Sequence, residues 1–144
     1  MCGRLVTSIE NGWVEWLVGE EDRSGNCPVR GLRLVHRTVG KSNCRYNLHK
    51  VFQEHSYIVE GLPLARFVGA DGLMLLLSLL ATGEMHQADI LELTKRLQIP
   101  GYEQVREMFP APEAQGIVNP AIADRYYLQS EIHELLLRAQ KRSA

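Results

Sequence analysis

The stretch Leu5–Val18, LVTSIENGWVEWLV, predicts a β-hairpin near the start of the chain. Apolar and polar residues alternate on both sides of the dipeptide Asn11-Gly12, as they do in half-buried strands. Asn-Gly supplies the two residues with positive φ that a tight hairpin turn needs. We therefore expect strands over Leu5–Ile9 and Trp13–Val18, joined by a turn at Asn11-Gly12.

Outward from this hairpin, alternation predicts further strands, and the spacing of apolar residues becomes helical after residue 69. The expected strands are Leu32–Val39, Ser56–Val59 and Leu64–Val68, whereas Asn43–His55 fits a short helix about as well as a strand. The expected helices are Leu73–Ala81, Ala88–Leu97 and Tyr102–Phe109. A last helix is expected to run to about Arg142 from Asn119-Pro120, because Asn is a favourable N-cap and Pro a favourable first helical residue. The residues expected to face inward from the last two helices are Tyr102, Val105, Phe109, Leu128, Ile132, Leu135 and Ala139.

These elements predict an α+β fold. The N-terminal half, residues 1–68, is β-rich, with the hairpin plus about three further strands. It is expected to pack against a C-terminal bundle of about four helices, residues 69–144. At 144 residues the chain is expected to form a single domain.

Composition favours a soluble globular protein, with 45% hydrophobic and 23% charged residues and a formal net charge of −1. The longest apolar run, Leu73–Leu80, is about half the length that a membrane span requires. No basic region followed by an apolar one marks a signal peptide at the N-terminus. We therefore expect a cytoplasmic protein with no membrane partner.

The distribution of charge is more informative than its total. From Arg23 to Gln53 there is no Asp or Glu, whereas residues 1–22 are acidic. Such a basic stretch predicts an anionic partner, either nucleic acid or another acidic partner, unless its cations pair with acids elsewhere in the fold. The candidate binding residues are Arg30, Arg33, Arg37, Lys41, Arg45 and Lys50, with Tyr46 and Phe52 as possible stacking surfaces for bases. The first hypothesis is thus a small nucleic-acid-binding regulatory or accessory protein.

The three short helices between residues 73 and 109 also fit a helix-turn-helix pattern. The last helix would then present Gln104 and Arg106 to DNA. Glu103 and Glu107 disfavour this interpretation, because they bring acidic charge toward phosphates. Three such helices are equally typical of an ordinary helical core.

The alternative function is a protein-binding inhibitor or adaptor without catalytic activity. The segment Leu73–Leu80 is apolar all round, which is typical of a central buried helix or of an interface. It predicts a protein partner or a homodimer formed through this helix.

A zinc site is a further candidate. Cys27, His36, Cys44 and His49 supply two thiolates and two imidazoles, the ligand types of tetrahedral zinc. None of their spacings matches the close Cys-x2-Cys pair of most structural zinc sites, and buried thiols or surface histidines explain these residues equally well. We therefore expect neither a metal nor another cofactor.

The second alternative is a small enzyme. Met1-Cys2-Gly3-Arg4 resembles the opening of the SOS-response-associated peptidase-like family, which crosslinks to abasic sites in DNA. The resemblance implies that removal of Met1 exposes a reactive Cys2. His36 followed by Thr38 resembles the nicotinamide-site strand of ADP-ribosyltransferases. Each resemblance covers at most four residues, so no catalytic residue is assigned.

Overall fold

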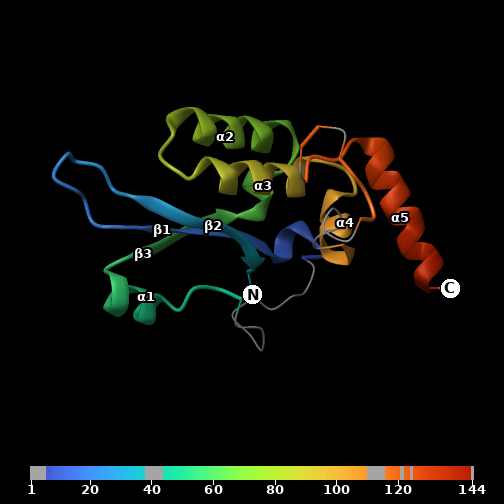
Figure 1. Ribbon diagram of the computed structural model, residues 1–144. Helices are drawn as coiled ribbons and strands as arrows, with labels where there is room; N and C mark the ends of the chain where they lie inside the picture. The colour runs from blue at the N-terminus through green and yellow to red at the C-terminus, as the bar shows by residue number, and fades with distance from the viewer. Residues whose placement is uncertain (1–5, 38–43, 110–115, 121, 124, 144) are drawn as a thin grey trace. The chain divides into compact units, whose positions relative to one another are not determined.

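The computed structural model describes residues 6–37, 44–109, 116–120, 122–123 and 125–143. They form two compact units, residues 1–94 and 95–144. The helices and strands are η1 Ile9–Asn11, β1 Gly12–Val18, β2 Val29–His36, α1 Leu48–His55, β3 Ile58–Pro63, η2 Leu64–Phe67, α2 Gly69–Thr82, α3 Gln87–Gln98, α4 Tyr102–Met108 and α5 Gln129–Ser143, where η marks a 3-10 helix (Figure 1). The predicted α+β class is confirmed.

The sheet of the first unit has three antiparallel strands in the order β2-β1-β3. β1 and β2 form a hairpin through a loop at residues 19–28, in which the Gly19 N–H donates to the Pro28 carbonyl. At the tip of the loop, the Asp22 carboxylate accepts hydrogen bonds from the N–H groups of Ser24 and Asn26. Residues 19–28 are therefore the hairpin connection.

The predicted hairpin between Leu5–Ile9 and Trp13–Val18 is wrong. Leu5 lies outside the described residues, Val6–Ser8 form no strand, and Ile9–Asn11 is a 3-10 helix. Gly12 has φ −95° and ψ 148°, which is extended backbone, so it begins β1 and forms no tight turn. Leu64 packs so closely on Gly12 that a Cβ there would lie 2.2 Å from its Cδ2. Long-range packing thus overrides the local Asn-Gly signal.

Of the three other strand predictions, one is wrong and two need different bounds. The strand expected at Leu64–Val68 is the 3-10 helix η2, in which Leu64 and Phe67 are buried. The strand expected at Ser56–Val59 begins at Ile58 and continues to Pro63 as β3. The strand expected at Leu32–Val39 is β2, which begins earlier, at Val29, and residues 38–39 lie outside the described part.

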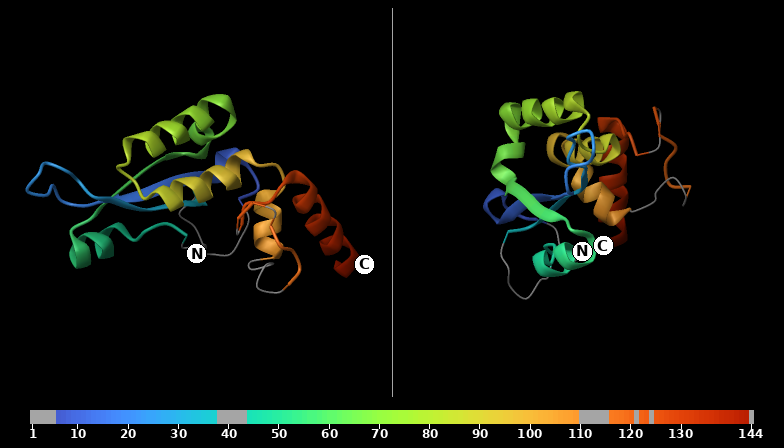
Figure 2. Two further views of the ribbon diagram at one scale, coloured as in Figure 1. Left: turned by 45° about the horizontal axis from the view of Figure 1, so that its top comes forward. Right: turned by 90° about the vertical axis from the view of Figure 1, so that its left-hand side faces the viewer.

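The ambiguous segment before β3 is helical over α1. Asn47 is its N-cap, and its side chain accepts a hydrogen bond from the Lys50 N–H. α1 contains no buried residue, so the cap is a principal stabilising contact of this helix. Figures 1 and 2 show α1 and α2 on opposite sides of the sheet.

α2 is not buried all round, contrary to one of the two interpretations of Leu73–Leu80. Only Gly72 and Leu76 of this helix are buried. Met74 and Leu77, one turn apart, are 65% and 46% exposed. In the described part of the chain, no helix is long and apolar enough to cross a membrane.

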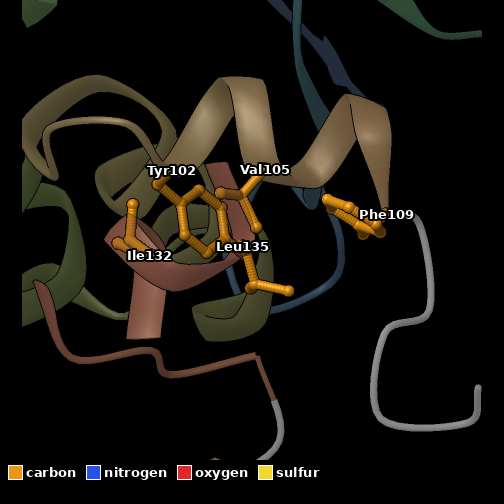
Figure 3. Packing of buried hydrophobic residues seen from close by; sticks show 5 residues of the cluster. All are labelled: Tyr102, Val105, Phe109, Ile132 and Leu135. Atoms are coloured by element: carbon orange, nitrogen blue, oxygen red, sulfur yellow. The ribbon is translucent and has the colours of Figure 1, made fainter. Parts of the chain in front are cut away.

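The second unit is held together by the contact between α4 and α5. Its buried cluster consists of Tyr102, Val105, Phe109, Ile132 and Leu135 (Figure 3). All five were predicted to face inward, whereas Leu128, also predicted to do so, is 44% exposed.

The last helix begins nine residues later than the sequence predicts, at Gln129 and not at Pro120. Ala123 and Tyr126 form an isolated antiparallel bridge, and Arg125 between them has φ 62°, in the left-handed region. This turn prevents a continuous helix from residue 120. The helix instead starts where the Glu131 carboxylate accepts a hydrogen bond from the Leu128 N–H.

Candidate nucleic-acid interface

The central group of the first unit is the Glu15 carboxylate, which is 0% exposed in the middle of β1. Glu15 pairs directly with Arg33 across the β1–β2 ladder. Arg33 Nε and Nη2 donate to Glu15 Oε1 over 3.0 and 2.7 Å. A buried carboxylate needs such a charged, hydrogen-bonding partner to offset its lost hydration.

The segment leading into α1 supplies two more donors to the same carboxylate. Arg45 Nε donates to Glu15 Oε2 over 3.3 Å, and the Tyr46 N–H donates to Oε1 over 2.8 Å. Two guanidinium groups therefore share one carboxylate, which leaves the cluster with a surplus of one positive charge. Arg33 and Arg45 keep 24% and 31% of their side chains exposed, so part of that charge faces solvent.

An irregularity in the β1–β2 ladder brings a third arginine to the same face. Glu15 pairs with Arg33 and Leu17 pairs with Arg30, so β2 contains one extra residue at this point. Glu15 and Leu17 lie on one face of β1, and cross-strand partners share a face. Arg30 and Arg33, three residues apart, therefore lie on the same face of the sheet.

Each of these arginines lies over an aromatic ring. The guanidinium carbons of Arg30, Arg33 and Arg45 lie 5.0, 3.4 and 5.1 Å from the ring centroids of Tyr57, Tyr46 and Trp13, respectively. These distances are within the range of cation–π attraction. We call the six residues the Arg–aromatic face.

Gly31, in the irregular segment of β2, makes room for one of these rings. Its φ is +67°, and a Cβ there would lie 2.5 Å from the Tyr46 hydroxyl. That hydroxyl donates to the Gly31 carbonyl over 3.1 Å. Burial raises the pKa of Tyr46, and the nearby charge of Arg33 only partly opposes this, so the hydroxyl keeps the proton that it donates.

The other predicted binding residues are in different situations. Arg37 is exposed at the end of β2, and no carboxylate in the described part of the chain pairs with it. Lys50 is exposed and lies 3.9 Å from the Glu54 carboxylate. Lys41 lies outside the described residues. The basic stretch is thus partly neutralised and partly available to a ligand.

The helix-turn-helix residues belong to the second unit. Gln104 is exposed on α4, and Arg106 donates to both Glu103 and Glu107. Glu103 also accepts two hydrogen bonds from Arg96. The three predicted helices exist as α2, α3 and α4, but the use of α4 as a DNA reader stays a prediction.

The zinc candidates are not assembled into a site. His36 Nδ1 lies 3.5 Å from Cys44 Sγ, but Cys27 is exposed in the β1–β2 loop and His49 is exposed on α1. Cys44 is disulfide-bonded, which removes its thiolate as a ligand. Within the ranges that the structure describes, no three His, Cys, Asp or Glu residues are grouped so as to hold a metal.

Cys2 and Thr38 lie outside those ranges, so the enzyme hypotheses stay predictions.

The sequence interpretation missed Glu15, Trp13 and Tyr57 as parts of the site. One signal was present, because Glu15 is the single charged residue within the apolar strand Trp13–Val18. A lone acid in such a strand needs a cation on the neighbouring strand. Which cation that is depends on the register, which the sequence pattern does not specify.

A shallow groove of about 440 Å³ lies beside this cluster, lined by Trp13, Trp16, Arg45, Val59, Glu60, Gly61 and Leu62. In the second unit, a smaller hollow of about 280 Å³ is lined by Phe109, Ile117, Arg138 and Lys141.

No protein-family model, curated protein or solved structure matches the chain.

Proposed function

We propose that this protein binds nucleic acid through the Arg–aromatic face of its three-stranded sheet. The observation that supports the proposal is the set of three guanidinium groups, each placed over an aromatic ring on one face of the sheet. Guanidinium groups bind phosphate oxygens in bidentate fashion, and bases stack on aromatic rings and on guanidinium planes. One face thus offers guanidinium groups for the phosphate of a nucleotide and flat ring or guanidinium surfaces for its base.

Glu15 restricts the conformations of two arginine side chains on this face. Exposed arginines sample many rotamers and lose that freedom on binding. Here Arg33 and Arg45 are held by the buried carboxylate before any ligand arrives. The entropic cost of binding is reduced accordingly, while the surplus charge of the cluster still attracts an anion.

The salt dependence of binding follows from the charges. The surplus charge of the cluster, together with Arg30 and Arg37, amounts to about three positive charges, so the slope of log K against log salt is about −2.1 for a single strand. Affinity then falls about 18-fold between 50 and 200 mM salt. Replacing Arg30 by Gln removes one charge, and the fall becomes about sevenfold.

Fluorescence anisotropy with a labelled 20-nucleotide DNA strand measures these slopes. A matched control is Arg138→Gln, because Arg138 is also exposed but pairs with Glu134 on α5, in the other unit. The control is expected to keep the wild-type slope. Binding that does not change with salt, or an Arg30→Gln slope equal to that of the wild type, would refute the proposal.

A protein-binding surface is the second candidate function. The observation in its favour is the pair Met74 and Leu77, large apolar side chains exposed one turn apart on α2. A homodimer through this helix would bury about 1,200 Å² or more in total. Light scattering coupled to size exclusion tests this candidate. A wild-type dimer that the Met74→Lys substitution converts to a monomer would support it, and a monomeric wild type would count against it.

A further inference from the structure

The groove beside Trp13 is lined in part by the Arg–aromatic face. Alternation along β1 places Trp13 on the side of Glu15, and the β1–β3 register places Gly61 opposite Glu15 and Val59 opposite Leu17. Arg45, which binds Glu15, is on this side as well. The side chains of Trp16 and Glu60, which pair with each other, belong to the opposite face. The groove thus lies at the β3 edge of the sheet. Trp13, Arg45 and Val59 line it from the Arg–aromatic face, and Trp16, Glu60 and Leu62, which also line it, belong to the opposite face.

Gly61 lets the Trp13 indole lie directly against β3. Any side chain at this position would collide with its neighbours, because a Cβ would lie 2.3 Å from Trp13 Nε1 and 2.6 Å from the Val14 carbonyl oxygen. The Trp13 N–H is buried and has no acceptor within the described residues. Because this N–H lies against Gly61 and is shielded from solvent, it is not available to a ligand in the groove.

The walls of the groove fit an unpaired nucleotide. Its volume of about 440 Å³ falls within the range of roughly 300–1,000 Å³ for small-molecule sites. Trp13 offers a ring for stacking. Arg45 adds a cation for the attached phosphate, and the surplus positive charge of the cluster complements that anion.

A double helix cannot present the face of a base to this groove. In a duplex the faces of the bases are covered by stacking and cannot reach Trp13. On the basis of the proposed function, we infer that the ligand is single-stranded nucleic acid and that one of its bases enters the groove beside Trp13 and Arg45.

Tryptophan fluorescence tests this inference directly, since the chain contains two tryptophans. In the Trp16→Phe variant, Trp13 is the only one. Addition of a 20-nucleotide single strand at 50 mM salt is expected to quench its emission. The duplex of the same sequence is expected to bind at least tenfold more weakly and without quenching.

Matched variants separate stacking from charge. Trp13→Leu keeps an apolar side chain but loses the ring, so the affinity for the single strand is expected to fall about 5- to 150-fold. Trp13→Phe retains a ring and should retain most of the affinity, which shows that the fold is intact. In Trp13→Phe the remaining Trp16, whose side chain belongs to the opposite face, should be quenched less than Trp13 is.

The outcomes distinguish the inference from the proposal on which it rests. If the duplex and the single strand bind equally, with the expected salt slope but no quenching, the inference fails and the proposed function stands. The inference also fails if polyglutamate binds as tightly as the oligonucleotide. If neither nucleic acid binds at low salt, both the inference and the proposed function fail.

Discussion

Replacing Glu15 by Gln tests whether the buried carboxylate organises the Arg–aromatic face. Gln keeps the shape and one acceptor oxygen, so the Tyr46 N–H retains a partner, but the charge that holds Arg33 and Arg45 is lost. Breaking a fully buried ion pair costs about 3–5 kcal/mol. Because the two arginine side chains are 24% and 31% exposed and regain hydration, we expect a loss of about 2–3 kcal/mol in the free energy of unfolding.

Urea unfolding followed by tryptophan fluorescence measures this loss. Trp13 and Trp16 both lie on β1, so the signal reports the first unit. With a slope of about 2 kcal/mol per molar urea, the midpoint should fall by about 1 M. The control is Glu10→Gln, which changes an exposed carboxylate on η1 and should alter stability by less than about 0.5 kcal/mol. If both variants unfold at the same urea concentration, Glu15 does not organise the face.

Three further predictions concern elements around the site. Asn47→Ala removes the cap of α1 and should cost about 1 kcal/mol, read as faster amide exchange in that helix, whereas Asn47→Asp should not accelerate it. Leu135→Ala opens a cavity in the second unit and should cost about 2–5 kcal/mol in urea unfolding followed by circular dichroism, whereas Leu137→Ala, at an exposed position, should cost far less. Burial acts to raise the pKa of Glu103, but the hydrogen bonds and charges of Arg96 and Arg106 outweigh it and hold that pKa below its usual value. The resulting stability is present above the ordinary pKa of Glu and is lost as pH falls through the lowered one, so acid should destabilise the wild type more than Glu103→Gln in the same unfolding assay.

The helical parts of the fold were largely predictable from the sequence. The spacing of Tyr102, Val105 and Phe109 identified the buried face of α4, and Ile132 and Leu135 identified that of α5. These contacts repeat within a few residues, so the local pattern carries the information. The start of α5 was not predictable, because the left-handed Arg125 and the cap from Glu131 are set by the packed chain.

The sheet and the candidate site depend on pairings that a local pattern does not specify. Asn11-Gly12 is a strong hairpin signal, yet Gly12 begins a strand because Leu64 packs against it. The basic stretch was visible in the sequence. The sequence did not show which of its arginines pair with a buried carboxylate and which stay available to a ligand. Arg33 and Arg45 pair with Glu15 only in the observed register, and Arg30 joins their face only through the irregularity near Gly31. A one-residue change of register would place these side chains differently.

Cross-linking tests the central claim most directly. A 20-nucleotide single strand bound to the intact protein is irradiated with ultraviolet light, and the attachment sites are identified by mass spectrometry. Our account predicts cross-links at Trp13, Tyr46 or Tyr57, the rings of the Arg–aromatic face. Cross-links confined to Tyr102 and its neighbours on α4, or none above those of a protein that does not bind nucleic acid, would contradict it.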